Sequence, residues 1–212
     1  MLINHSHKFV FIRVPKTAST SCVFYFGDSG LMDPETDVYA GKSVKPLLNI
    51  CKVAPTGEHK RTSLEIAVGQ TPYLHAPHYK IVERYPDTAG YESLACVRNP
   101  VDRFCSFVSG HMTNESSSAI EIQSAIYKAL DEKKLYPQVY YYGPSTIVWP
   151  FETVEEKVIE YITKKGGSVR RKWHQRNSNS GRIKIFLNKD IENSILDFYS
   201  KDFELWEKTM AN

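Results

Sequence analysis

The chain has 212 residues, 42% of them hydrophobic and 24% charged, which is an ordinary composition for a globular protein, so we expect residues 1–212 to form a single domain. The formal net charge of +3 is too small to indicate a nucleic-acid-binding protein. No apolar run approaches the roughly 20 residues that span a bilayer, and no basic-then-apolar leader opens the sequence, so we expect a soluble, cytoplasmic protein that does not bind membranes.

Two short apolar runs predict buried strands. Residues 8–14 (KFVFIRV) are rich in β-branched and aromatic side chains with little alternation, as in a strand covered on both faces, and residues 94–97 (LACV) form a second run of this kind. Pro15 ends the first run, and Pro100 follows the second. Pro100 suits the first turn of a helix that has Asn99 as its N-cap.

Apolar residues at helical spacing predict four helices. The first helix follows Pro100, and the second covers residues 122–130. The third begins at Thr153, and the fourth runs over residues 191–206. In the third of them, Thr153 and Glu156 form a capping-box pattern, and Gly166 and Gly167 close the helix. This segment is the clearest helix in the chain.

Two further segments are predicted to be extended. Residues 147–151 indicate a strand near a sheet edge, because Pro150 removes one backbone donor. Residues 182–187 are predicted to be a late strand or an extended link. Strands that alternate with helices indicate an α/β fold with a largely parallel sheet flanked by helices.

A loop of small polar residues, 15–21 (PKTASTS), connects the first predicted strand to a helix. Small residues let backbone N–H groups approach an anion, and a helix N-terminus adds a favourable partial charge. Lys16, Thr17, Thr20 and Ser21 add further donors. The loop is therefore predicted to hold a phosphate group, although it lacks the G-x-x-x-x-G-K-[ST] pattern of common ATPases and GTPases.

A second motif, residues 97–106 (VRNPVDRFCS), follows the second predicted strand. Arg98 lies at the end of the strand, and Ser106 lies about two turns into the next helix. A guanidinium group and a hydroxyl in these places are suited to a second phosphate. Ligands of open parallel sheets bind beyond the carboxyl ends of the strands, where both motifs fall.

Together, the two motifs resemble those of the sulfotransferase superfamily, most closely its carbohydrate branch. That branch reads approximately F-I-H-I-P-K-T-x-G-T-S and V-R-N-P-x-x-R-x-x-S, where this chain has FIRVPKTASTS and VRNPVDRFCS. Residues 150–152 (PFE) and 199–206 (YSKDFELW) also look like the family pattern. The departures are Arg13, where histidine is common, and Ser19, where glycine is usual and where a side chain would obstruct the approach of backbone to a phosphate.

The resemblance implies a three-layer α/β fold related to P-loop NTPases and a sulfotransferase that uses 3′-phosphoadenosine 5′-phosphosulfate (PAPS) as donor. It assigns the 5′-phosphosulfate to the first loop, through Lys16, Thr17, Ala18, Ser19, Thr20 and Ser21. It assigns the 3′-phosphate to Arg98 and Ser106, with Arg176 from a late basic loop close to the same group.

In-line transfer of a sulfuryl group needs a cation on the leaving side and a base for the acceptor. Lys16 is the candidate for the cation. His75 and His78 are the candidates for the base, with His75 favoured, since imidazole has an unperturbed pKa of about 6.5. No metal is expected, because no cysteine or carboxylate near the two histidines has a convincing ligand spacing.

The resemblance also implies an acceptor hydroxyl on a sugar or glycan, and residues 52–73 and 113–118 are the loops expected to select it. Two alternatives stay open. One is a nucleotide-dependent phosphotransferase with an atypical phosphate loop, which predicts a preference for ATP with magnesium. The other is a non-catalytic module that binds a polyanion through the basic residues 164–176. The oligomeric state is not indicated by the sequence.

Overall fold

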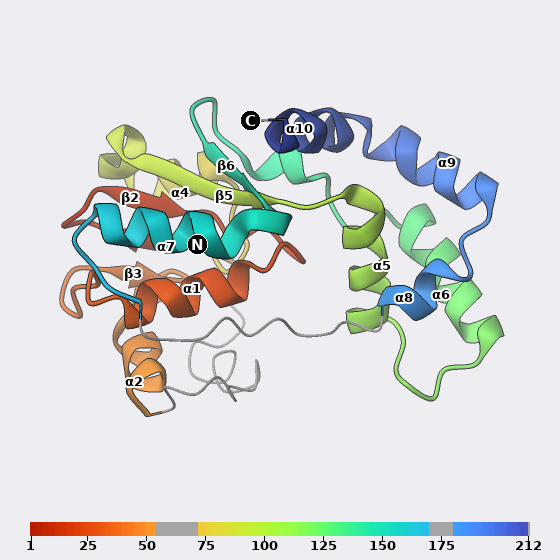
Figure 1. The fold of residues 1–212 in the computed structure, drawn as a ribbon, viewed down its shortest axis with the longest axis horizontal. Helices are drawn as coiled ribbons and strands as arrows, with labels where there is room; N and C mark the ends of the chain where they lie inside the picture. The colour runs from red at the N-terminus through yellow and green to blue at the C-terminus, as the bar shows by residue number, and fades with distance from the viewer. Residues whose placement is uncertain (54–71, 170–179, 212) are drawn as a thin grey trace. The chain divides into compact units, whose positions relative to one another are not determined.

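A computed structural model describes residues 1–53, 72–169 and 180–211 of the chain. The chain divides into two compact units, which we describe separately (Figure 1). The first unit comprises Met1–Cys96 and Tyr141–Gln175, and the second unit comprises Val97–Tyr140 and Arg176–Asn212. None of the helices in the described residues is long and apolar enough to cross a membrane.

A six-stranded sheet, in the order β4-β3-β1-β2-β5-β6, forms the centre of the first unit. The strands are β1 (Leu2–Asn4), β2 (Phe9–Phe11), β3 (Val38–Tyr39), β4 (Lys42–Ser43), β5 (Glu92–Val97) and β6 (Ile147–Pro150). Strands β2 and β5 are parallel, whereas the pairs β1–β2, β1–β3 and β3–β4 are antiparallel. The predicted α/β class is confirmed, but the sheet is mixed instead of largely parallel, because two short hairpins add antiparallel strands.

Helices cover both faces of this sheet. The helices of the first unit are α1 (Ser19–Asp28), α2 (Lys45–Val53), α4 (His78–Arg84) and α7 (Val154–Lys164), with short 3₁₀ turns at Pro86–Gly90 and Phe151–Thr153. Side chains alternate across a strand, so Phe9 and Phe11 pack with Phe26 of α1, whereas Val10 packs with Ile81 of α4. The result is the expected three-layer arrangement (Figure 1).

The second unit is helical and has a core of its own. Its helices are α5 (Pro100–His111), α6 (Ala119–Asp131), α8 (Ser180–Lys184), α9 (Lys189–Phe198) and α10 (Ser200–Met210). Phe104, Val108, Ile126, Ile183 and Ile195 are buried in this core. The apolar spacing that predicted helices after Pro100 and over residues 122–130 therefore marks the faces that pack together.

The predicted helix boundaries are confirmed where side chains cap the backbone. The side chain of Asn99 accepts hydrogen bonds from the N–H groups of Val101 and Asp102, as expected for the N-cap of α5. The strand over residues 147–151 is confirmed as β6, and it lies at a sheet edge. The proline therefore occupies a position where the loss of a backbone donor is tolerated.

Three expectations about helix ends and extended segments are wrong. The side chain of Thr153 makes no capping hydrogen bond, because the chain enters α7 from a 3₁₀ turn and buries the Thr153 hydroxyl. Residues 182–187 are not extended, since α8 (Ser180–Lys184) occupies the start of this segment. The single helix predicted over residues 191–206 is divided into α9 and α10 at Tyr199, where φ is −106°.

Candidate active site

The loop at residues 15–21 turns back on the carbonyl group of Val14. The hydroxyl of Thr17 donates a hydrogen bond to the Val14 carbonyl oxygen at 3.0 Å, and the hydroxyl of Ser19 donates to the same oxygen at 2.9 Å. Both side chains are buried. Lys16 and Ala18 have positive φ angles of 68° and 59°, which produce the tight turn before α1.

Ser19 does not require the conformational freedom of glycine. It is the first residue of α1, and the left-handed angles fall on Lys16 and Ala18 instead. Its side chain points inward to the Val14 carbonyl group and is 4% exposed. The departure from the family pattern at Ser19 therefore places no side chain on the exposed surface of the loop.

The N-terminus of α1 has the features of an anion-binding site. Ala18, at the N-cap position, makes no side-chain capping hydrogen bond, and the first turn of the helix contains no acidic residue. The first N–H groups of a helix have no partner within the helix and carry a partial positive charge. Thr20 and Ser21 lie in the first turn and are partly exposed, as is Lys16 in the preceding loop. This end of the helix is suited to a phosphate or sulfate group.

His75 is hydrogen-bonded to the backbone of the segment that precedes this loop. Its Nδ1 atom lies 2.7 Å from the carbonyl oxygen of Arg13. Because a carbonyl oxygen only accepts hydrogen bonds, Nδ1 carries the proton, and in the neutral ring the basic lone pair is on Nε2. The structure thus brings His75 and the segment that leads into the phosphate loop together within the first unit.

His78 has a different setting. It is the first residue of α4, and its ring packs so closely on Gly143 that a Cβ atom at Gly143 would lie 2.5 Å from the Nδ1 atom of His78. Burial lowers the pKa of His78 below its ordinary value of 6.5. His78 is therefore neutral near pH 7, and its ring is held by packing.

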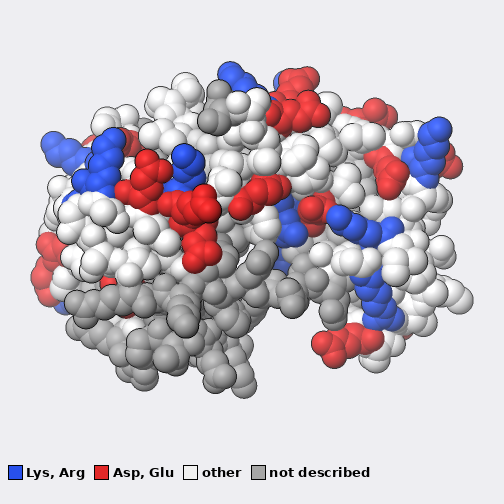
Figure 2. Space-filling model, in the orientation of Figure 1, with Lys and Arg blue, Asp and Glu red and all other residues white. Residues whose placement is uncertain are grey.

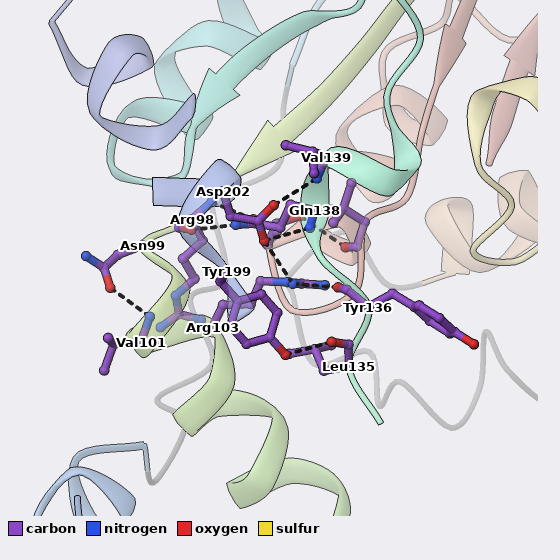
Figure 3. A network of polar contacts seen from close by, with 12 residues as sticks. Arg98, Asn99, Val101, Arg103, Leu135, Tyr136, Gln138, Val139, Tyr199 and Asp202 are labelled. Atoms are coloured by element: carbon purple, nitrogen blue, oxygen red, sulfur yellow. Dashed lines mark hydrogen bonds and ion pairs between the residues drawn. The ribbon is translucent and has the colours of Figure 1, made fainter. Parts of the chain in front are cut away.

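The second motif begins where β5 ends. Arg98 follows Val97, and the side chain of Gln138 is hydrogen-bonded to the backbone of Arg98 on both sides. The Arg98 N–H group donates to Oε1 of Gln138 at 2.9 Å, and Nε2 of Gln138 donates to the Arg98 carbonyl oxygen at 2.9 Å (Figure 3). Ser106 is buried on α5. The amide of Gln138 thereby fixes the backbone from which the Arg98 side chain extends.

A buried ion pair supports Gln138 from the C-terminal helix. Asp202 of α10 accepts hydrogen bonds from the N–H groups of Gln138 (2.7 Å) and Val139 (2.9 Å), and it lies 3.8 Å from Nη1 of Arg103 (Figure 3). Arg103 also donates to the Tyr136 carbonyl oxygen at 3.0 Å. Burial raises the pKa of Asp202, and the two N–H groups and Arg103 oppose this shift.

Sequence reasoning missed the roles of Gln138 and Asp202. Asp202 lies within residues 199–206, which resembled the family pattern without indicating a contact. No sequence pattern indicated the contact between Gln138 and Arg98, because a single glutamine in a loop has many possible partners. Arg103 belongs to the second motif, but its buried partner lies about a hundred residues away in the sequence and no local spacing reveals it.

The predicted site residues are distributed over both units. Lys16, Thr17, Ala18, Ser19, Thr20, Ser21, His75 and His78 belong to the first unit, and Arg98 and Ser106 belong to the second. Arg176 lies outside the described residues. The loop follows β2 and the second motif follows β5, and since these strands are parallel neighbours, the chain leaves both at the same edge of the sheet.

The face of the molecule drawn in Figure 2 shows no single basic surface among the described residues. In the face drawn in Figure 2, Lys and Arg are interspersed with Asp and Glu. Lys165, at the start of the basic stretch 164–176, forms an ion pair with Glu92. Among the described residues, no group of three His, Cys, Asp or Glu side chains is placed to hold a metal ion.

A comparison with protein families identifies the family of the chain. The model of a family described as the sulfotransferase family matches residues 1–141, which is more than half of the chain and includes both motifs that were predicted to bind phosphate. Comparisons with curated proteins and with solved structures found no match. The chain belongs to the sulfotransferase family, and it is a sulfotransferase enzyme.

Proposed function

We propose that the protein transfers a sulfuryl group from PAPS to a hydroxyl group of a sugar or glycan. The observation that carries the donor assignment is the N-terminus of α1, which has no side-chain cap and no acidic residue in its first turn and which follows Lys16. Phosphosulfate is an anion of the size and charge that such a helix end binds. The second motif, after the neighbouring parallel strand, supports a donor with a second phosphate.

The residues fit the donor in the following way. The first N–H groups of α1, together with Lys16, Thr20 and Ser21, bind the 5′-phosphosulfate, and the inward side chains of Thr17 and Ser19 hold the loop in shape. Arg98 and Ser106 bind the 3′-phosphate. Arg176 is proposed as a further contact to this phosphate on the family resemblance alone.

PAPS supplies, when bound, a sulfuryl group attached to a phosphate that is a good leaving group. Lys16 stabilises the negative charge that develops on the leaving side. Nε2 of His75 accepts the proton that the acceptor hydroxyl loses, because the Arg13 carbonyl group keeps the proton of the neutral ring on Nδ1. His78 remains the alternative base, although its ring is packed against Gly143.

An exposed aromatic pair supports a saccharide acceptor. The rings of Tyr136 and Tyr140 in the second unit are stacked with centroids 5.3 Å apart, and the two residues are 59% and 42% exposed. Figure 3 shows the side chain of Tyr136 pointing away from the polar network around Arg103. Exposed aromatic faces of this kind are suited to the apolar face of a sugar ring, and a tyrosine hydroxyl adds a polar group.

The proposal is tested by following radioactive sulfur from labelled PAPS to a panel of sugars, phenols and aliphatic alcohols. We expect label on a saccharide. Transfer only to a non-saccharide hydroxyl would contradict the acceptor assignment, and transfer to none, with ATP accepted as a phosphoryl donor instead, would contradict the donor assignment.

The same assay distinguishes the two candidate bases. We expect His75→Asn to lower turnover by about 100-fold or more, the range typical for loss of a general base, while its affinity for adenosine 3′,5′-bisphosphate stays unchanged. His78→Asn serves as the matched control and is expected to retain most of its turnover. The opposite result, loss of turnover in His78→Asn but not in His75→Asn, would assign the role of general base to His78.

A further inference from the structure

Arg13 is a buried cation for which the described part of the chain provides no carboxylate. The residue is 5% exposed, and its guanidinium group donates hydrogen bonds to two neutral hydroxyls, those of Tyr39 and Thr20, the latter at 2.8 Å. Its Nε atom is buried and has no hydrogen-bond partner among the described residues. Burial of an uncompensated charge is costly, so proteins ordinarily pair such a group.

A comparison within the chain shows the usual solution. Arg103 is 1% exposed and lies 3.8 Å from Asp202, which is itself fully buried. Arg13 has only hydroxyls and the face of the Tyr39 ring, 5.6 Å from the guanidinium carbon. Of these two buried arginines, Arg13 is the one whose counter-charge the described residues do not supply.

The surroundings of Arg13 add positive potential instead of removing it. Thr20, which accepts from the guanidinium group, is the second residue of α1, so the cation faces the positive end of the helix dipole. The first turn of α1 has no acidic residue, and Lys16 lies three residues after Arg13 in the chain. Two cations and a helix N-terminus in one loop form a site that an anion completes.

The hydrogen bond from Arg13 also determines what Thr20 offers to a ligand. Because Oγ1 of Thr20 accepts from the guanidinium group, the hydroxyl proton is directed elsewhere. Thr20 is partly exposed, so this proton is available to an anion at the helix end. Arg13 therefore acts on the site through Thr20 and through its charge.

We propose that Arg13 is a positioning residue of the anion site, whose missing counter-charge is the phosphate or phosphosulfate group attached to the 5′ position of the donor. This inference rests on the proposed function, because it takes the ligand of the α1 N-terminus to be an adenosine phosphate. It extends that function by giving a role to one of the two residues at which this chain departs from the family pattern.

The test measures how much the 5′-phosphate contributes to binding. Dissociation constants of adenosine 3′,5′-bisphosphate and adenosine 3′-phosphate are compared by calorimetry in the wild type, Arg13→Gln, Thr20→Val and the double variant. We expect the bisphosphate to bind more tightly to the wild type, and each single variant to reduce this preference about tenfold, as for loss of one charge-assisted hydrogen bond. Since Arg13 acts through Thr20, the fold-reduction of this preference in the double variant should be smaller than the product of the two single reductions.

Control variants separate a role in binding from a role in folding. Arg84→Gln removes an exposed cation from the same unit and should leave the preference unchanged. Arg13→Lys keeps a buried cation and should retain more of the preference than Arg13→Gln. If Arg13→Gln does not fold, the comparison is made with Arg13→Lys and with Thr20→Val, since Thr20 is partly exposed.

The outcomes distinguish this inference from the proposed function. A preference that Arg13→Gln leaves unchanged, or an equal loss of affinity for both ligands, would overturn the role of Arg13 while leaving the donor assignment intact. If the wild type bound neither nucleotide, the donor assignment would fail. Thermal stabilisation by inorganic pyrophosphate would then test whether Arg13 contributes to anion binding without a nucleotide. Loss of this stabilisation in Arg13→Gln would support the role of Arg13, and unchanged stabilisation would contradict it.

Discussion

Ala18 has a strained backbone conformation beside the proposed anion site. It has a φ angle of 59° immediately before α1, a conformation that costs an L-residue roughly 1–2 kcal/mol. Glycine removes this strain but loses more chain entropy on folding, by roughly 0.5–1 kcal/mol. We therefore expect Ala18→Gly to raise the free energy of unfolding by about 0.5 kcal/mol, the difference between these two effects, in urea denaturation.

The control for this substitution is Ala129→Gly inside α6, where the backbone is helical. That change should lower the free energy of unfolding by about 1 kcal/mol or more, since glycine is a poor helix former and the buried methyl group of Ala129 is lost. If both substitutions destabilised the protein equally, the strain assigned to Ala18 would be wrong.

His78 makes the stability of the fold depend on pH. Burial lowers its pKa in the folded protein below the ordinary 6.5, so the unfolded chain takes up a proton first as the pH falls. The neutral ring contributes fully to the free energy of unfolding above about pH 6.5, and this contribution is lost as the pH falls through the lower pKa of His78 in the folded protein. We expect the wild type to lose more unfolding free energy than His78→Gln when urea denaturation is repeated from about pH 7.5 down to about pH 5.5. The same pH dependence in both proteins would contradict this assignment.

At the scale of elements, Gln138 links the end of β5 to the C-terminal helix. Its amide is paired with both backbone groups of Arg98, and its own N–H group donates to Asp202 of α10. Gln138→Leu leaves two backbone groups without these bonds, at a cost of roughly 1–3 kcal/mol for each group that becomes buried and unsatisfied. We expect a loss of about 2 kcal/mol in unfolding free energy and weaker binding of adenosine 3′,5′-bisphosphate.

Two further variants define what the amide does. Gln138→Glu keeps an acceptor for the Arg98 N–H group but places a buried carboxylate against the Arg98 carbonyl oxygen, so near pH 7 it should be at least as destabilising as Gln138→Leu. Gln123→Leu alters an exposed glutamine of α6 in the same unit and should leave stability and binding unchanged. Wild-type stability in Gln138→Leu would show that these hydrogen bonds contribute little.

Long, regular elements were predictable from the sequence, and short or composite ones were not. The α5 helix was predicted because its N-cap, its first-turn proline and its apolar face agree. The strands β1, β3 and β4 have only two or three residues, too few for a periodic pattern. The break at Tyr199 depends on packing: the Tyr199 hydroxyl donates to the Leu135 carbonyl oxygen at 2.6 Å, a contact that the apolar spacing of residues 191–206 does not encode.

The candidate site was predictable in its composition but not in its connections. Small polar residues after a strand indicated the loop around Lys16, and Arg98 followed from the second motif. The hydrogen bond from His75 to the Arg13 carbonyl group joins residues 62 positions apart, and Gln138 reaches Arg98 over 40 positions. Such contacts arise from the tertiary fold, so single-sequence patterns do not reveal them. Likewise, no sequence pattern reveals that Arg13 lacks a carboxylate partner among the described residues.

At the scale of the whole molecule, the chain passes from the first unit to the second at Val97, returns at Tyr141 and passes to the second again at Arg176. The two motifs that were predicted to bind phosphate lie before and after the first passage in the sequence, and both fall within the residues that match the sulfotransferase family. That one donor with two phosphates uses both motifs stays a proposal. That the chain folds as a single domain stays a prediction.

The donor assignment is tested by calorimetric titration of adenosine 3′,5′-bisphosphate into the wild type and Arg98→Ala, with ADP and ATP–magnesium as competitors. Lys128→Ala, which removes an exposed cation of α6, is the matched control. We expect tight binding that requires both the 3′-phosphate and Arg98 and that Lys128→Ala leaves unchanged. Absence of binding, or stronger binding of ATP–magnesium, would contradict the donor assignment.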